Sequence, residues 1–260
     1  EVETTARLPE YIARAFHMAQ SGRPGPVVLA LPEDILSAMA DTPDLAPARP
    51  VQQAVDPAAA RAALEALVSH RKPLIVAGGS GWSKQAQEDL EALSTATGLP
   101  VAVPFRRQDY IDNAHPNYVG DLSVGMNPKL GQRLRDADAL LILGSRMGDS
   151  PTNGYELMDP ANPGKTIIHV HPGPDELASV YQPDIAIAAH APDFLAALRG
   201  VDDLGVQDPS WTSDGRAEYE RWQQPQATPG AVRMEETVRW LSDHLDGRGI
   251  LTNGAGNYAA

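Results

Sequence analysis

The sequence predicts an α/β protein whose core is a doubly wound, parallel β-sheet. From about residue 56 to residue 200, short continuous apolar runs alternate with segments whose apolar residues recur at helical spacing. Continuous apolar strands are typical of sheets that helices cover on both faces, and right-handed crossovers join such strands in parallel. The five expected strands lie at residues 72–79, 99–105, 137–144, 165–171 and 184–190.

Amphipathic segments between these strands predict the helices. Asp56 and Pro57 have the residue types of an N-cap and a first helical position. Further helices are expected at residues 83–98, where a glycine closes the segment, and at 191–200. A short helix is expected to begin near Pro174.

A helix and a strand precede this central region. Residues 8–20 carry apolar side chains at helical spacing, and Val27–Leu31 is an unbroken apolar run that predicts a buried strand. Residues 37–55 are proline-rich and show no period, which predicts a linker. We therefore expect a first segment at residues 1–36, a linker, and a central domain at residues 56–200.

Similar pieces follow the central domain. Residues 201–230 begin with a polar stretch that predicts a second linker. Residues 231–260 form the last segment, in which Met234–Leu245 has one apolar helical face and Ile250–Leu251 predicts a strand.

Composition and charge exclude several classes of protein. The chain has 42% hydrophobic and 21% charged residues, a net charge of −13 and a pI of about 4.9. Such a charge repels nucleic acids and anionic membranes, so neither is expected as a partner. Cysteine is absent, which excludes disulfides and thiolate chemistry and fits a reducing cytoplasm, the location we expect. The apolar run at Ala139–Gly144 is too short to span a bilayer, and the first residues lack the features of a signal peptide.

Glycines follow the first strand of the central domain, in the stretch VAGGSGW at residues 76–82. Small residues at the end of a strand let the backbone approach a phosphate, and the start of the next helix favours an anion. The stretch is neither GxGxxG nor a P-loop, so a tight strand-to-helix turn is the favoured alternative. The candidate residues for a nucleotide here are Gly78, Gly79 and Ser80.

A second candidate group follows the most apolar strand, in LGSRMGDSPTNGY at residues 143–155. Ligands of open α/β sheets bind at the carboxyl ends of strands. The guanidinium of Arg146 suits a phosphate, Asp149 could orient it or bind a ribose hydroxyl, and Ser145 lies beside them. A surface pair of Arg146 and Asp149 is the alternative.

Histidines and arginines complete the candidates. His169 and His171 share one face of a strand, so a metal pair is conceivable, but no third ligand accompanies them; we favour one packed histidine and one, His171, that lines the cleft. Arg106 begins an arginine pair that is either a phosphate clamp or solvated. His115 is interpreted as a turn residue. No catalytic constellation or metal site is predicted.

Taken in order, these segments resemble the thiamine diphosphate-dependent enzymes of the acetolactate synthase type across almost the whole chain. The most specific stretch is AFHMAQSGRPGPVVLALPEDIL at residues 15–36, which looks like the end of that family's pyrimidine-binding domain. Residues 56–200 look like its central domain. GILTNGAGNYAA at residues 249–260 looks like the start of its diphosphate-binding domain.

The resemblance implies cofactors that this chain alone does not hold. The family's catalytic glutamate belongs to the first part of the pyrimidine-binding domain, and its Gly-Asp-Gly motif and later Asn, which hold Mg²⁺ and the diphosphate, follow the stretch at residues 249–260. We expect the chain to be the middle of a longer enzyme that needs thiamine diphosphate and Mg²⁺, and the segment alone to be inactive and to bind no cofactor. The diphosphate turn would be formed by Gly254, Gly256, Asn257 and Tyr258.

Some central domains of this family bind FAD, others ADP, and many bind neither. The family's Arg-Phe-Asp-Asp-Arg motif becomes residues 146–150, which keep the first Arg and the second Asp, and His-Ile-Asp-Ile-Asp becomes residues 169–173, with His171 at the first Asp. Its final Gly-Asp is Ala189-His190. These departures disfavour FAD and leave a different nucleotide, such as ADP, or a vacant cleft.

The resemblance implies that the chain is the central region of a decarboxylase or carboligase that acts on a 2-oxo acid. Such an enzyme is a lyase or a transferase. We expect it to assemble as a homodimer or homotetramer. The alternative is a free-standing nucleotide-binding or interaction module without catalytic activity. A deacylase-like NAD-binding domain shares the topology but has no further support in the sequence.

Overall fold

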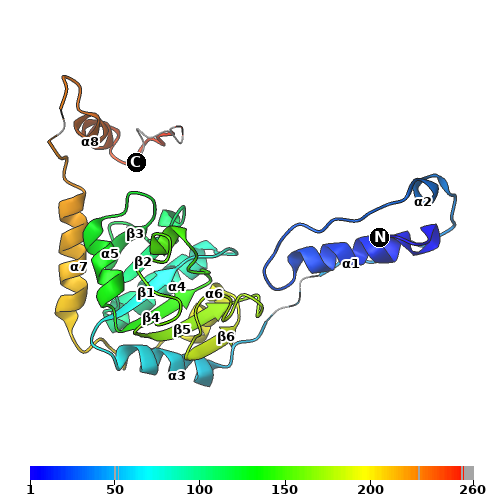
Figure 1. Cartoon of the computed structure of the whole chain (residues 1–260), viewed down its shortest axis with the longest axis horizontal. Coiled ribbons are helices and arrows are strands. Elements are labelled where there is room, and N and C mark those ends of the chain that lie inside the picture. The colour runs from blue at the N-terminus through cyan, green and yellow to red at the C-terminus, as the bar shows by residue number, and fades with distance from the viewer. Residues whose placement is uncertain (50, 52, 228, 253, 255–260) are drawn as a thin grey trace.

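A computed structural model describes residues 1–49, 51, 53–227, 229–252 and 254 of the protein. Its centre is a six-stranded sheet in which every neighbouring pair is parallel (Figure 1). The order β3-β2-β1-β4-β5-β6 is doubly wound, as the sequence predicts. The strands are β1 (Pro73–Ala77), β2 (Val101–Pro104), β3 (Tyr118–Leu122), β4 (Ala139–Leu143), β5 (Thr166–His171) and β6 (Ile185–Ala188).

The direction of winding reverses between β1 and β4. β2 and β3 extend the sheet on one side, whereas β5 and β6 extend it on the other. The register pairs Ala77 with Leu143, so the two central strands end level with each other. Loops that leave adjacent strands at such a reversal diverge toward opposite faces, which makes the carboxyl ends of β1 and β4 the expected ligand crevice.

Helices cover both faces of the sheet because its strands are apolar on both sides. Along β1, Ile75 packs into the core beneath α3, α4 and α6, whereas Leu74 and Val76 pack into the opposite core with Leu130 and Leu134 of α5. The helices of this body are α3 (Pro57–Val68), α4 (Lys84–Thr97), α5 (Pro128–Asp136), α6 (Ala191–Ala197) and α7 (Pro209–Trp222), with 3₁₀ turns η2 (Gln108–Tyr110) and η3 (Ser150–Thr152).

The helix boundaries follow local chemistry. The Asp56 side chain accepts a hydrogen bond from the Ala58 N–H at the start of α3, and the Ser83 hydroxyl accepts one from the Ala86 N–H at the start of α4. Gly98 closes α4 with a φ of 71°. These features confirm the predicted N-cap at Asp56 and the predicted end of the second helix.

The structure differs from three predictions for the central domain and the stretch that follows it. The sheet has a sixth strand, β3, and a following helix, α5, which the sequence analysis missed because Tyr-Val-Gly-Asp-Leu is not a continuous apolar run. The residues after Pro174 form turns instead of a helix. The stretch predicted as a polar linker contains α7, which packs beside β3.

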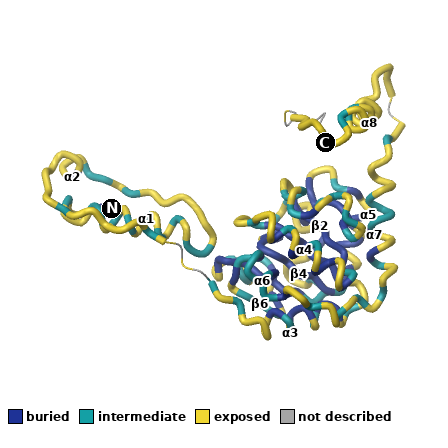
Figure 2. Tube along the Cα trace, turned by 180° about the vertical axis from the view of Figure 1, so that it is seen from behind, coloured by how far each residue is buried: buried dark blue, intermediate teal, exposed yellow. Residues whose placement is uncertain are grey.

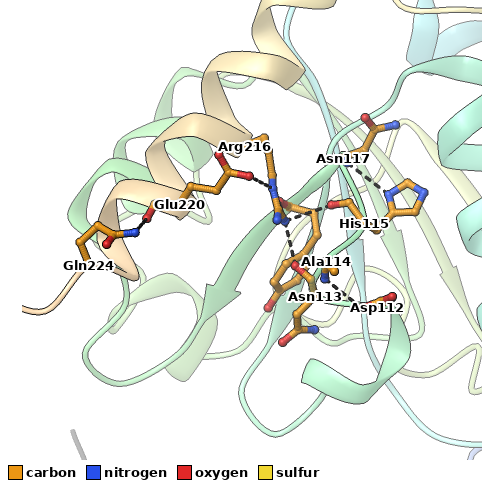
Figure 3. Close-up of polar contacts among 9 residues, drawn as sticks. Asp112, Asn113, Ala114, His115, Asn117, Arg216, Glu220 and Gln224 are labelled. Carbon is orange, nitrogen blue, oxygen red and sulfur yellow. Dashed lines mark hydrogen bonds and ion pairs between the residues drawn. The ribbon is translucent and has the colours of Figure 1, made fainter. Parts of the chain in front are cut away.

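Polar side chains attach α7 to the body, which explains why its apolar pattern is weak. The Arg216 guanidinium donates to the carbonyl oxygens of Asn113 at 2.8 Å and His115 at 3.0 Å (Figure 3). The Trp211 indole N–H donates to the Pro73 oxygen at 2.8 Å, and the Thr212 hydroxyl donates to the Gly98 oxygen at 2.7 Å. Helical segments held by such bonds lack the periodic apolar stripe on which sequence analysis depends.

The N-terminal segment extends away from the sheet (Figures 1 and 2). It contains η1 (Thr5–Arg7), α1 (Leu8–Gln20) and α2 (Glu33–Ser37). The helix predicted at residues 8–20 is confirmed, but Val27–Leu31 is neither a strand nor buried: Val28 is 90% exposed. An apolar run can form a buried strand only where neighbouring strands pair with it, and the described part of the chain provides none.

The C-terminal segment contains α8 (Met234–Leu245), which confirms the predicted helix. Ile250 and Leu251 do not form the predicted strand, and Ile250 is 93% exposed. As at Val27–Leu31, the apolar residues lie in extended chain without a partner strand. α8 also exposes Val238 and Trp240.

An ion pair joins α4 to the end of α6. The Arg199 guanidinium donates to both carboxylate oxygens of Asp89, at 2.8 and 2.7 Å, and the Asp89 side chain is only 7% exposed. The guanidinium stabilises the charged carboxylate and lowers the pKa of Asp89, although burial opposes this effect. A lowered pKa in the folded state means that the pair stabilises the protein fully above pH about 3.9 and progressively less as the pH falls further.

We expect Asp89→Asn to lower the free energy of unfolding at neutral pH by about 1 kcal/mol, since Arg199 is half-exposed. The difference from the unmodified protein should shrink near pH 3, where the carboxylate of Asp89 takes up a proton, as measured by urea unfolding at both pH values. Glu88→Gln is the matched control, because Glu88 lies on the same helix and pairs with the exposed Lys84 at 3.8 Å. An unchanged difference at low pH would contradict the assignment.

Candidate functional site

The carboxyl edge of the sheet brings most of the predicted site residues together. Gly78, Gly79 and Ser80 directly follow β1, Ser145 and Arg146 follow β4, and His171 ends β5. A Cβ built on Gly78 would lie 3.0 Å from the Ser145 Cβ. The structure therefore places the glycine turn against the loop after β4, at the reversal of the sheet.

Close packing between these two turns requires glycine. Gly79 has a φ of 83°, and a Cβ at this position would lie 2.4 Å from the Gly144 oxygen. A Cβ on Gly144, which has a φ of 68°, would lie 2.7 Å from the Gly78 oxygen. The tight turn that the sequence analysis considered is thus present, and its glycines have a packing role irrespective of any phosphate.

Three side chains that the sequence analysis did not select hold the glycine turn. The Trp82 indole N–H donates to the Gly78 oxygen at 2.8 Å, and the Gly79 oxygen accepts from the Arg107 Nε at 2.8 Å and the Tyr110 hydroxyl at 2.9 Å. The rings of Trp82 and Tyr110 stack with centroids 4.5 Å apart. Burial raises the pKa of the Tyr110 hydroxyl, so it remains a donor. No sequence motif marks these residues, because they converge only in the folded chain.

The two adjacent arginines have different positions. Arg106, the predicted site residue, is exposed, and its guanidinium lies 4.8 Å from the centroid of the Phe105 ring. Arg107 is the one that reaches the glycine turn. Because Arg106 has a φ of 61°, the backbone turns sharply here and directs the two side chains differently.

The two histidines of β5 are buried and hydrogen-bonded within the protein. The His169 Nε2 donates to the Ser145 oxygen at 2.8 Å, and the His171 Nδ1 accepts from the Gly173 N–H at 3.1 Å. Burial lowers the pKa of both rings, which are therefore neutral at pH 7. Among the described residues, no group of three or more histidine, cysteine, aspartate or glutamate side chains is arranged to hold a metal ion.

Arg146 does not pair with Asp149, the surface pair considered from the sequence. Its guanidinium lies 3.8 Å from the Glu176 carboxylate and is 56% exposed, whereas Asp149 is exposed and caps η3 by accepting from the Ser150 N–H. The same Glu176 carboxylate also pairs with Arg23 of the N-terminal segment. Glu176 thus connects the loop after β4 to a residue 153 positions away in the sequence.

The turn after β5 is where the N-terminal segment meets the body. Besides the Arg23–Glu176 pair, the Gln53 amide donates to the Pro172 oxygen at 3.1 Å. A Cβ on Gly173 would lie 3.4 Å from the Arg23 Cβ. Arg23 of the N-terminal segment and Gln53 of the linker therefore both contact the turn that follows His171.

Most of the predicted diphosphate turn lies outside the residues that the structure describes. Gly254 is exposed and belongs to no helix or strand. Gly256, Asn257 and Tyr258 lie outside the described residues. The role of these four residues therefore stays a prediction.

The fold and the carboxyl edge of the sheet define a doubly wound α/β domain. Domains of this type bind ligands where the strand order reverses, which here is between β1 and β4. Residues 60–198, more than half of the chain, match the family described as "Thiamine pyrophosphate enzyme, central domain". The chain belongs to this family of thiamine pyrophosphate enzymes, as the sequence resemblance predicts.

Curated relatives agree with this membership. The chain is 30% identical over 204 residues to the acetolactate synthase large subunit of Corynebacterium glutamicum, covering 74% of this chain and 31% of the relative. It is 26% identical over 268 residues to an acetolactate synthase of Mycobacterium leprae (96% and 41%) and 30% identical over 203 residues to a glyoxylate carboligase of Escherichia coli O157:H7 (76% and 33%). The chain thus spans about a third of the length of the curated relatives it matches. None of the described helices is long and apolar enough to cross a bilayer.

We expect Gly79→Ala to lower the free energy of unfolding by about 2–4 kcal/mol, since it combines an unfavourable positive φ with a clash against Gly144. Gly200→Ala is the matched control: Gly200 has a φ of 80°, and its Cβ would meet nothing within 4 Å. It should therefore cost only the conformational part, about 1 kcal/mol. Equal losses in urea unfolding would show that the contact with Gly144 is not tight.

Glu176→Gln should loosen the N-terminal segment where it meets the body. Removing the charge weakens the contacts with Arg23 and Arg146, so hydrogen exchange of amides in residues 21–25 should speed up by about two- to fivefold. Glu65→Gln removes a comparable exposed pair with Arg61, on α3, and should leave this exchange unchanged. Identical exchange in the two variants would rule out Glu176 as the connection.

Proposed function

We propose that the protein is the central region of a thiamine diphosphate-dependent enzyme that cleaves or joins carbon–carbon bonds next to the carbonyl of a 2-oxo acid, hence a lyase or transferase. The observation that carries this proposal is the match of residues 60–198 to the family's central domain. Relatives named acetolactate synthase and glyoxylate carboligase support it. Thiamine diphosphate, when bound, supplies the ylid and the electron sink that this chemistry requires.

In this proposal the chain connects and spaces two cofactor-binding domains. Residues 1–36 are the end of the pyrimidine-binding domain, and residues 231–260 begin the diphosphate-binding domain. Residues 37–55 and 201–230 connect these domains to the central one, the second stretch with α7 packed on the body. Gly254, Gly256, Asn257 and Tyr258 would approach the cofactor diphosphate, and Mg²⁺ would be held by residues of the same domain. The segment by itself performs no catalytic step.

Exposed apolar side chains support an assembly of subunits. Phe16 of α1 is 60% exposed and Trp240 of α8 is 61% exposed. Large apolar side chains in such numbers are typical of surfaces that other domains or subunits cover. We propose a homodimer or homotetramer, located in the cytoplasm.

In this proposal the carboxyl edge of the sheet is either a site for a nucleotide other than FAD or vacant, and the chain by itself is expected to bind none. Arg146 offers an exposed guanidinium to a phosphate. His171 stands where the family's FAD-binding members have a carboxylate, and it is neutral, buried and bonded to its own turn. The residues present therefore do not fit FAD in the manner of those relatives.

The experiment that tests the main proposal compares two lengths of protein. In calorimetry with thiamine diphosphate and Mg²⁺, the 260-residue chain should show no saturable binding, because the residues that hold both belong to neighbouring domains. A gene product extended on both sides should bind the cofactor and release CO₂ from a 2-oxo acid. Saturable binding by the short chain, or an extended protein without activity, would refute the proposal.

The nucleotide cleft has a separate test. In calorimetry neither FAD nor ADP should bind the 260-residue chain. If ADP binds the extended protein, Arg146→Gln should weaken that binding about fivefold or more by removing a charged contact with phosphate. Arg135→Gln, an exposed arginine at the far end of α5, should leave the affinity unchanged. Saturable binding of either nucleotide by the 260-residue chain would refute this part of the proposal.

A further inference from the structure

His115 lies where the loop before β3 meets α7 and α4; Figure 3 shows the loop and α7. Its Nε2 is 3.0 Å from the Thr95 hydroxyl of α4, and its Nδ1 accepts a hydrogen bond from the Asn117 N–H at 3.2 Å. Its backbone oxygen accepts from Arg216 of α7 at 3.0 Å and from the Tyr118 N–H at 3.0 Å. The residue therefore shapes the loop that enters β3 and also receives the side chain that attaches α7.

The hydrogen bonds require a neutral ring. A backbone N–H can only donate, so the Nδ1 of His115 must carry a lone pair, which leaves the proton on Nε2. A proton added to Nδ1 would place two donors against each other and break the bond to the Asn117 N–H. The turn after His115 would lose one of the two bonds that close it and would keep the bond from the Tyr118 N–H to the His115 oxygen.

Loosening this turn affects α7 directly. Arg216 donates to the oxygens of Asn113 and His115 in the loop that His115 closes, and to the oxygen of Tyr118 where β3 begins. A Cβ on Gly215 would lie 2.8 Å from the Val119 Cγ1 of β3, which shows how closely α7 approaches this edge strand. The loop is thus one attachment of α7 at the outermost strand of the sheet, beside the bonds of Trp211 and Thr212 elsewhere on the body.

Charges around His115 act in both directions. Arg216 of α7 disfavours a second positive charge, whereas Glu91 of α4 and Asp112 of the loop favour it, and Glu220 pairs with Arg216 at 2.8 Å. Burial is the strongest influence and lowers the pKa of the ring. The ring is neutral at pH 7 and becomes charged only in mildly acidic solution.

We propose that His115 is a proton-sensitive latch: neutral, it holds α7 against β3, and protonated, it releases the helix from the loop at residues 112–118. α7 also leads from the body toward α8. The protonation state of His115 therefore affects how stably the body holds the helix that connects it to the C-terminal segment. This inference is independent of the cofactor and of the nucleotide cleft.

The direction of the effect follows from the lowered pKa. Because the unfolded loop takes up the proton more readily than the folded loop, attachment of α7 is complete above the ordinary histidine pKa of about 6.5 and weakens as the pH falls below it. The amides of α7 should therefore exchange faster at pH about 5.5 than at pH about 7.5, by about three- to tenfold after correction for the chemical pH dependence of exchange.

Hydrogen exchange of the whole chain, read in peptides that cover residues 209–222, measures this release. In His115→Asn, the amide oxygen can accept from the Asn117 N–H and cannot be protonated, so α7 should keep its protection at both pH values. His70→Asn is the matched control. The His70 Nδ1 donates to the Ala66 oxygen and its Nε2 contacts the Thr166 hydroxyl at 3.0 Å, so protonation breaks neither contact, and this variant should respond to pH like the unmodified chain.

A response to pH in His115→Asn as large as that of the unmodified chain would overturn the proposal, and so would the absence of any response in the unmodified chain. Nitrogen NMR of the histidine rings provides a measurement that needs no variant. His115 should carry its proton on Nε2 at neutral pH and should titrate over the range in which α7 loses protection. A proton on Nδ1 at neutral pH would refute the latch.

Discussion

Burial of both faces of a parallel sheet is the constraint on which the rest of the structure depends. The strands β1, β2 and β4 are each buried along their whole length, so helices must cover the sheet on both sides. α3, α4 and α6 supply one layer and α5 the other. At the outer edge, β3 is covered by α7, a polar helix that follows β6 in the chain and returns across the molecule to reach it.

The same arrangement creates the carboxyl edge. Parallel strands end together, so the turns after β1 and β4 meet. Their glycines pack so closely that neither Gly79 nor Gly144 has room for a Cβ. Trp82, Arg107 and Tyr110 then fix the carbonyl oxygens of the glycine turn. The result is a closely packed edge, at which the exposed guanidinium of Arg146 lies beside the Glu176 carboxylate.

Membership in the thiamine pyrophosphate enzyme family gives this domain its context. Its body is complete as a folded unit, with a sheet covered on both faces, whereas α1 and α8 carry exposed apolar side chains. The body contacts the N-terminal segment at the turn after β5, and it is joined to the C-terminal segment through α7. Charged and titratable groups occupy both places, which makes these attachments sensitive to single substitutions.

Local patterns in the sequence determined the doubly wound class, five of the six strands, and the ends of α3 and α4, because apolar runs and caps act within a few residues. They did not determine β3 or α7, whose places depend on contacts between distant residues such as Arg216 and the loop at 113–118. They predicted strands at Val27–Leu31 and Ile250–Leu251, where the described chain offers no partner strand. At the site, the sequence indicated the glycines, Arg146 and His171 by their place after strands. Only the tertiary structure decided that Arg107, and not Arg106, reaches the glycine turn, since side-chain direction depends on the backbone turn at Arg106.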